Sequence, residues 1–216
     1  MSYDWFMEKT ILSEIADIFT GMVLPKKSLM LQAKSPFSKN SLREYRIISI
    51  ADVSDRGEIS RELDTMTFED SERIKKYSVR YDDIIVSSRG TRIKSALVGP
   101  SVRDNTLISS NLICVRILER EDFPPELINF FMRSQFGESS LRRISNAPSG
   151  AVNLNVKTLG SFRVPNFSRE EAERIMEAVR TMNEIENLMM EQRSVFEIFK
   201  KSAEEKFLRK YEDKPE

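Results

Sequence analysis

The sequence predicts an α+β chain, with a mixed globular domain over residues 1–165 and one long helix over residues 166–216. Short apolar runs separated by polar turns fill the first part, as in a domain built from many short strands. After Pro165, neither proline nor glycine occurs until Pro215, so a single helix of about 43 residues can form. A chain of 216 residues accommodates one domain and this helix, but not two full domains as well.

Strands are expected wherever apolar residues alternate with polar ones or form short runs that end in turn residues. These segments are YRIISIADVS (45–54), YDDIIVSSRGT (81–91), SALVGP (95–100), SSNLICVRIL (109–118) and SFRVP (161–165). The segment PPELINFFMRSQFG predicts a short helix that begins at its prolines and stops at Gly137. The polar segment 139–160 is rich in turn formers and predicts a long loop.

The C-terminal helix has a clear start and a heptad pattern. Ser168 and Glu171 form an S-x-x-E capping box. Apolar residues recur at heptad positions a and d, which is typical of a coiled coil. The expected interface residues are Ile175, Met182, Ile185, Met189, Phe196 and Phe199. A helix of about 65 Å cannot bury its stripe against a domain of this size, so a partner is expected. An amphipathic helix packed on its own domain is the alternative.

The composition excludes several classes of protein. With 40% hydrophobic and 31% charged residues, no membrane-spanning run and no signal-peptide core, a cytoplasmic location is expected. The single cysteine, Cys114, fits a reducing compartment and is expected to be an inert core thiol. A net charge of zero argues against a uniformly basic nucleic-acid binder. The absence of histidine removes the commonest general base and metal ligand, so neither a metal nor a cofactor is expected.

The order of motifs resembles the specificity subunits of Type I restriction–modification systems. The matching segments are WFMEKTILSEIADIFTG, DDIIVSSRGT, LINFFMRSQ, SGAVNLNVKTLGSFRVP and the long helix that opens beside Pro165. Such subunits usually carry two target recognition domains and two long helices, whereas this chain has one of each. The resemblance therefore implies a half-length form, whether natural or a fragment. It also implies an antiparallel homodimer, with a DNA methyltransferase subunit and a restriction subunit as partners.

The resemblance makes residues 1–165 a target recognition domain for double-stranded DNA, and three polar segments offer base-reading side chains. Arginine pairs with guanine and asparagine with adenine, while other residues of such a surface contact phosphates. The expected DNA-binding residues are Arg89, Thr91, Arg92, Lys94, Arg103, Asn105, Arg142, Arg143, Asn146, Ser149, Asn153 and Lys157. Lys26, Lys27, Lys34 and Lys39 are expected to contact phosphates. Ordinary solvated loop residues are the alternative for any one of them. A twofold dimer predicts an interrupted palindrome as the target.

The chain itself is expected to be non-catalytic. The string DFPPEL lacks the amide and the aromatic ring of an amino-methyltransferase motif, and its prolines indicate a helix start. Asp82 and Asp83 precede a strand without the acidic-x-lysine pattern of a metal-dependent nuclease. Two other hypotheses remain open: a coiled-coil adaptor that binds no nucleic acid, and a nuclease component with an unrecognised site.

Overall fold

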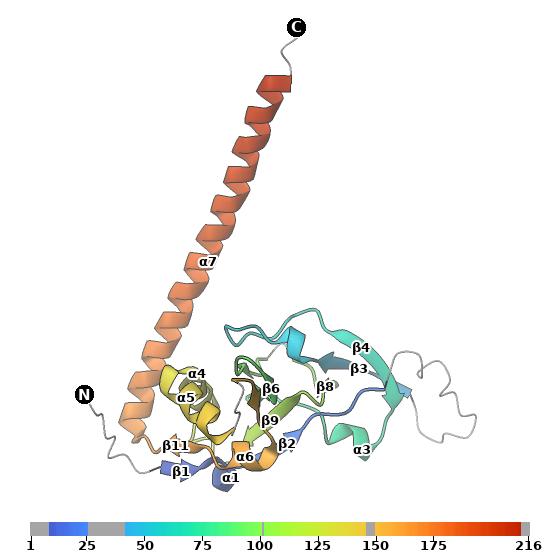
Figure 1. Ribbon diagram of the computed structural model, residues 1–216, viewed down its shortest axis with the longest axis vertical. Helices are drawn as coiled ribbons and strands as arrows, with labels where there is room; N and C mark the ends of the chain where they lie inside the picture. The colour runs from blue at the N-terminus through green and yellow to red at the C-terminus, as the bar shows by residue number, and fades with distance from the viewer. Residues whose placement is uncertain (1–8, 26–41, 101, 146–149, 213–216) are drawn as a thin grey trace. The chain divides into compact units, whose positions relative to one another are not determined.

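The computed structural model describes residues 9–25, 42–100, 102–145 and 150–212, with side chains up to residue 208. Two compact units make up the chain, one reaching Ala172 and the other beginning at Glu173. The first unit mixes short strands and short helices, and the second is the remainder of one long helix (Figure 1). The predicted α+β class is thus confirmed.

A four-stranded antiparallel sheet forms the centre of the first unit, in the order β2-β9-β5-β7. Its strands are β2 (Ala16–Thr20), β9 (Leu112–Ile117), β5 (Ile84–Ser87) and β7 (Ser95–Leu97). Ile84 and Val86 lie in one hydrophobic cluster, whereas Ile85 between them lies in another. Both faces of the sheet are therefore covered, which explains why these strands read as continuous apolar runs.

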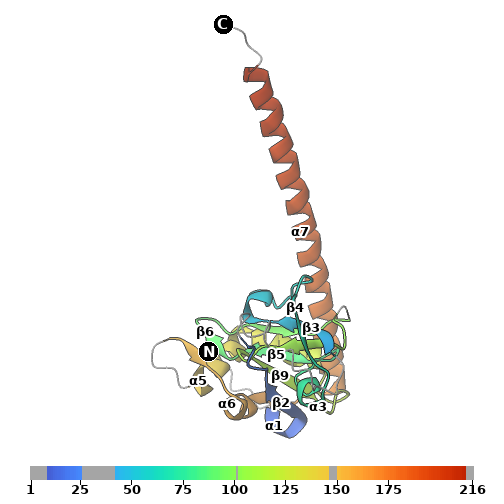
Figure 2. The ribbon, with the colours of Figure 1, turned by 90° about the vertical axis from the view of Figure 1, so that its right-hand side faces the viewer.

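Helices cover one face of this sheet (Figure 2). They are α1 (Leu12–Ile15), α4 (Pro125–Arg133), α5 (Gln135–Ile144) and α6 (Val156–Gly160). Ile128 of α4, Leu141 of α5 and Leu159 of α6 share a buried cluster with Ile84. The apolar stripe of each short helix is thus stabilised by the sheet and not by the helix alone.

A three-stranded sheet lies on the other side, in the order β4-β3-β8. It consists of β3 (Leu42–Ile48), β4 (Asp64–Glu69) and β8 (Thr106–Ile108), with the 3₁₀ turn η1 (Ile50–Asp52) and helix α3 (Glu72–Lys75) nearby in sequence. Ile48 and Ile108 join the second cluster of the central sheet. Two short antiparallel pairs complete the unit: β1 (Lys9–Ile11) with β11 (Arg163–Pro165), and β6 (Arg89–Gly90) with β10 (Val152–Asn153).

Two local predictions were wrong. Gly137 does not stop a helix: α4 ends at Arg133, Ser134 accepts a hydrogen bond from the Gly137 amide as the N-cap of α5, and Gly137 lies inside α5. The expected loop over residues 139–160 contains the end of α5, then β10 and α6. The local signals were misleading because Gly137 is required by packing, since a Cβ there would overlap the carbonyl oxygen of Phe131.

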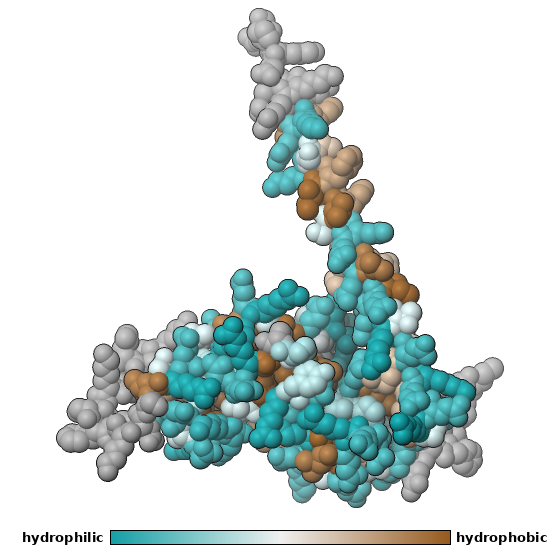
Figure 3. All heavy atoms as spheres, turned by 180° about the vertical axis from the view of Figure 1, so that it is seen from behind, coloured by the Kyte–Doolittle hydropathy of each residue, from teal (hydrophilic) through white to brown (hydrophobic). Residues whose placement is uncertain are grey.

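The long helix α7 spans Arg169–Glu212 and has 44 residues. Its predicted capping box is present: the Ser168 amide donates to a Glu171 carboxylate oxygen over 2.9 Å, and the Glu171 amide donates to Ser168 Oγ over 3.3 Å. Apolar side chains line α7 (Figure 3), and from Met182 to Phe199 the heptad residues Met182, Ile185, Met189, Phe196 and Phe199 are 52–71% exposed. Ile175 is half-buried. No helix among the described residues is apolar enough over a sufficient length to cross a membrane.

Candidate nucleic-acid interface

The turn between β5 and β7, residues 88–94, carries four of the predicted DNA-binding residues. It is closed by the Ser87 amide, which donates to the Lys94 carbonyl over 2.8 Å, and by the Lys94 amide, which donates to Ser87 Oγ over 2.9 Å. Gly90 has a φ of 144°, a conformation that favours glycine. Arg89, Thr91 and Arg92 are exposed on this turn, and Lys94 is half-buried.

The ladder between β6 and β10 places two predicted base readers side by side. Arg89 and Asn153 are directly opposite each other in this antiparallel pair, and both are exposed. Opposite residues in a ladder project from the same face, with Cβ atoms about 5 Å apart. The Leu154 amide donates to the Ser88 carbonyl over 2.7 Å and extends the pairing by one step. An arginine and an asparagine, distant in sequence, therefore form one exposed pair.

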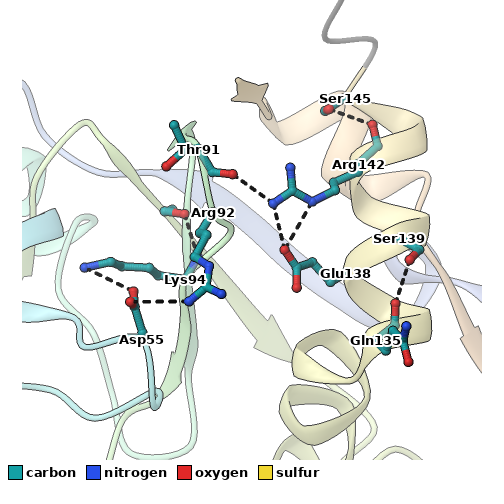
Figure 4. A network of polar contacts seen from close by, with 10 residues as sticks. Asp55, Thr91, Arg92, Lys94, Gln135, Glu138, Ser139, Arg142 and Ser145 are labelled. Atoms are coloured by element: carbon teal, nitrogen blue, oxygen red, sulfur yellow. Dashed lines mark hydrogen bonds and ion pairs between the residues drawn. The ribbon is translucent and has the colours of Figure 1, made fainter. Parts of the chain in front are cut away.

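Asp55 contacts the β5–β7 turn directly on one side, and on the other side Glu138 contacts it through Arg142, which donates to the Thr91 carbonyl (Figure 4). Asp55 lies 3.7 Å from Arg92 and 3.8 Å from Lys94, whose Nζ also donates to the Val53 carbonyl over 2.7 Å. On the other side, Glu138 accepts hydrogen bonds from Nε and Nη2 of Arg142 over 3.1 and 2.8 Å. All three ion pairs are partly exposed, so each contributes at most about 1 kcal/mol, and their main effect is on the geometry of the turn.

Neither carboxylate was singled out from the sequence. The i,i+4 spacing of Glu138 and Arg142 is a recognisable helix signal, but the turn formers of residues 139–160 predict a loop that contains Arg142. No pattern in the residues around Asp55 indicates that its side chain contacts the β5–β7 turn. Its partners lie far along the chain and meet it only through the fold.

The remaining predicted residues fall into different places. Arg143 is exposed near the end of α5, and Lys157 is exposed on α6. Arg103 is exposed, whereas the Asn105 amide group donates to the Glu44 carbonyl over 2.9 Å and thereby contacts β3. The segment around Asn105 is not only a loop, because the buried strand β8 runs through it. Asn146, Ser149 and the four lysines Lys26, Lys27, Lys34 and Lys39 lie outside the described residues.

Asp83, considered above as a nuclease carboxylate, belongs to a buried ion pair. Its two carboxylate oxygens accept hydrogen bonds from Nε and Nη2 of Arg116 over 2.9 and 2.7 Å. Asp83 also accepts from the Arg80 amide over 2.7 Å and is fully buried. The hydrogen bonds that Arg116 donates to Asp83 raise the pKa of Arg116 above its ordinary value. Among the residues that the structure describes, no group of three or more carboxylate or cysteine side chains is placed to hold a metal ion.

Comparisons with known proteins identify the fold. No protein-family model matches the sequence, and no curated protein matches it either. Among solved structures, the HsdS subunit from Thermoanaerobacter tengcongensis aligns with 87% of this chain at 18% identity and a TM-score of 0.55. A chain from a structure of the assembly and conformational transition of a type I R-M system aligns with 94% at 19% identity and a TM-score of 0.57. The type IIG restriction endonuclease BpuSI aligns with 80% at 12% identity and a TM-score of 0.52.

Each alignment covers a larger share of this chain than of the protein to which it is compared. This chain spans 44% of the length of the HsdS subunit, 50% of the type I system chain and 26% of the endonuclease. In the first two comparisons, this chain spans about half the length of the protein it matches. The protein has the fold of the specificity subunits of Type I restriction–modification systems, as its motifs predicted.

Proposed function

We propose that this protein is the DNA-recognition subunit of a Type I restriction–modification enzyme, in a half-length form. As a homodimer, it would direct a partner methyltransferase and a restriction subunit to an interrupted palindromic site. Residues 1–165 would contact DNA, and residues 166–216 would carry dimerisation and methyltransferase binding. The fold shared with the HsdS subunit supports this proposal.

The observation that carries the proposal is the pairing of Arg89 with Asn153 on the β6–β10 ribbon. A two-stranded ribbon fits the major groove of B-DNA, and there arginine can bind guanine O6 and N7 while asparagine binds adenine N6 and N7. These two residue types are the commonest specific readers of their bases, and here they are neighbours on one exposed face. Thr91, Arg92 and Arg143 are also exposed and would contact phosphates or flanking bases.

The homodimer is supported by α7. Large apolar side chains are exposed along this helix from Met182 to Leu208, which is costly unless a partner covers them. A twofold dimer would present two identical reading surfaces in inverted orientation, so its target would be a palindrome with an unread spacer. The helix would then set the length of that spacer.

We further propose that the chain performs no chemistry itself and acts in the cytoplasm. Asp83 is engaged by Arg116, so its carboxylate serves the core of the domain. Methylation and cleavage would be performed by the partner subunits. Cys114 is free and buried, in keeping with a reducing compartment.

The proposal can be tested by selecting DNA duplexes from a random pool with the purified chain, alone and with its methyltransferase subunit, at increasing salt. We expect an interrupted palindrome to be enriched and affinity to fall steeply with salt. Arg89→Ala and Asn153→Ala should each weaken binding by about 5- to 150-fold and relax specificity at one position of each half-site. Arg163→Ala removes a similar exposed charge from β11 and is the matched control.

Other results would favour the alternatives. Binding that is absent, or that does not depend on salt, would indicate a coiled-coil adaptor. Cleavage of DNA by the chain alone with Mg²⁺ would indicate a nuclease component.

A further inference from the structure

The bounds of α7 give this helix a defined midpoint. It spans Arg169–Glu212, so its centre lies between Met190 and Glu191. When two copies of a helix pair in opposite directions about a twofold axis at that centre, they overlap along their whole length. Arg169 is then level with the partner's Glu212. In the same way, each residue before the midpoint is level with the partner's residue that lies the same number of positions after the midpoint.

This arrangement matches the heptad pattern. In an antiparallel coiled coil, an a residue of one helix packs beside a d residue of the other. About the midpoint of α7, Met182 is level with the partner's Phe199, and Ile185 is level with the partner's Phe196. These four side chains are large, apolar and more than half exposed. Two copies would therefore bury them against one another in layers of similar size.

Smaller and polar heptad residues also fall together. Ala178 is level with the partner's Ala203, so a small residue faces a small one. Gln192, the one polar residue between Met182 and Phe199 in the stripe, is level with the partner's Met189 beside the axis, and it is exposed in the single chain. Towards the ends of the helices, Ile175 is level with the partner's Lys206. The apolar layers of the interface therefore lie between this pair and the twofold axis.

We propose that two copies of this chain pair through α7 in this centred register, with Met182 beside the partner's Phe199 and the twofold axis between Met190 and Glu191. This inference rests on the homodimer proposed above and specifies its geometry. It predicts that the starts of the two α7 helices lie about 65 Å apart along the coiled coil, which is the full helix length.

The residues that flank the stripe favour the same register. When two helices are antiparallel, residues at heptad position e of one helix lie beside residues at position e of the other, and residues at position g lie beside residues at position g. In the centred register, Glu186 lies beside the partner's Arg193, which is an attractive pair that the twofold axis repeats. On the other flank, Leu188 lies beside the partner's Val195, and both are more than 60% exposed in the single chain.

Competing arrangements are less favourable. In a parallel dimer, a residue at heptad position g lies beside the residue at position e of the partner helix that is five positions further along the sequence. Leu188 would then face the partner's Arg193, and Val195 would face the partner's Lys200. Two apolar residues would thus be covered by charges, and Gln192 would face its own copy.

An antiparallel register shifted by one heptad is also worse. In one direction, Ala178 would face the partner's Phe196, and in the other, Ala203 would face the partner's Ile185. Each shift also leaves seven residues of each helix without a partner. Of the arrangements compared, the centred register therefore gives the best match of size and charge over the layers between Ala178 and Ala203.

Cysteine cross-linking in the full-length chain tests the register. Met182→Cys and Phe199→Cys are made separately, and each is oxidised alone and in a mixture. We expect a cross-linked dimer only from the mixture, because two copies of residue 182 would be about 25 Å apart along the coiled coil, too far for a disulfide. A mixture of Met182→Cys with Gln192→Cys probes the shifted register and should not cross-link. The wild-type chain, whose Cys114 is buried, is the control.

Sedimentation of the same variants separates the possible failures. A monomer at high concentration would overturn both the homodimer and its register. A dimer in which Met182→Cys cross-links with itself, or with Gln192→Cys, would overturn the register and leave the proposed homodimer intact. DNA binding, measured separately, reports on the recognition role alone.

A charge reversal gives an independent measure. Arg193→Glu should weaken the dimer by about tenfold, because a glutamate at position 193 would lie beside the partner's Glu186. The twofold axis produces this repulsive pair twice in each dimer. The double variant Glu186→Arg with Arg193→Glu should restore the wild-type dimer constant. If the double variant is weaker than the single one, the two residues are not neighbours and the register is wrong.

Discussion

Arg142 donates a hydrogen bond from Nη2 to the carbonyl oxygen of Thr91 over 2.8 Å, and thereby connects helix α5 to the β5–β7 turn. The same guanidinium is held by Glu138, one helical turn earlier. Because Arg142 contacts the backbone of Thr91, it fixes the path of the turn irrespective of the side chain there. Arg89 and Asn153, which we propose to read bases, lie on the adjoining ribbon, so the geometry of this turn bears directly on them.

Glu138→Gln is therefore expected to weaken DNA binding, by up to about fivefold, since the loss of the carboxylate charge lets Arg142 leave Thr91. The dependence of affinity on salt should stay unchanged, because no DNA-facing cation is removed. Glu119→Gln removes an equivalent charge from an exposed position and is the control. Tighter binding by Glu138→Gln would show instead that Arg142 contacts DNA and that Glu138 competes for it.

Asp83→Asn is expected to lower the free energy of unfolding by about 3–5 kcal/mol, because it leaves Arg116 in the core without its carboxylate. Urea denaturation measures this loss as a lower midpoint with an unchanged slope. Asp82→Asn is the matched control: Asp82 is partly exposed, lies 3.6 Å from Arg120 and has a φ of 67°, which asparagine tolerates. Equal losses in the two variants would contradict a special role for the buried pair.

The stability of the domain is expected to fall above about pH 9. Burial raises the pKa of Cys114 well above its ordinary value of 9.0, and burial together with the hydrogen bond to Asp70 raises the pKa of Tyr45 above 10.0. The folded state then keeps protons that the unfolded state releases, so their stabilising contribution is present below pH 9 and is lost as the pH rises. Urea titrations from pH 8 to pH 10.5 measure this. Cys114→Ala should flatten the first part of the curve, and parallel curves for the two proteins would contradict the assignment.

Gly137→Ala is expected to destabilise the domain by about 1–3 kcal/mol or more, because the added methyl group overlaps the carbonyl oxygen of Phe131 and forces α4 and α5 apart. Gly99→Ala is the control, since nothing lies within 4 Å of a Cβ at that position. Thermal unfolding of both variants gives the comparison. An unaffected Gly137→Ala protein would mean that the two helices do not pack as described.

Repeating residues 183–189 after Met189 adds one heptad to α7 and keeps the a and d positions in phase. The helix grows by about 10.5 Å, so the unread spacer of the target should lengthen by about three base pairs. Methylated sites mapped in cells that express the variant with its methyltransferase measure the spacer. A two-residue insertion rotates the following a and d residues by about 200° around the helix, so it should weaken dimerisation strongly and is the control. An unchanged spacer would refute the role of the helix as a ruler.

Features that depend on neighbouring residues could be predicted from the sequence. The apolar runs at Ile84–Val86 and Leu112–Val115 are strands because alternate side chains enter two different clusters. The capping box at Ser168 and the uninterrupted helix that follows were also predicted correctly, since capping and helix continuation are decided within a few residues. The local pattern at Gly137 is misleading, because the contact that requires glycine comes from the carbonyl of Phe131, on the preceding helix.

By itself, the sequence thus determined the α+β class, the long helix with its apolar heptads, and the residue types suited to reading DNA, because periodicity and side-chain chemistry are local properties. Only the tertiary structure decided which of those residues meet. It set Asn153 opposite Arg89, directed Arg142 to the backbone of Thr91, and brought Asp55 beside Arg92. Such pairings depend on strand register and on packing between distant segments, and these arise from the burial of the whole core.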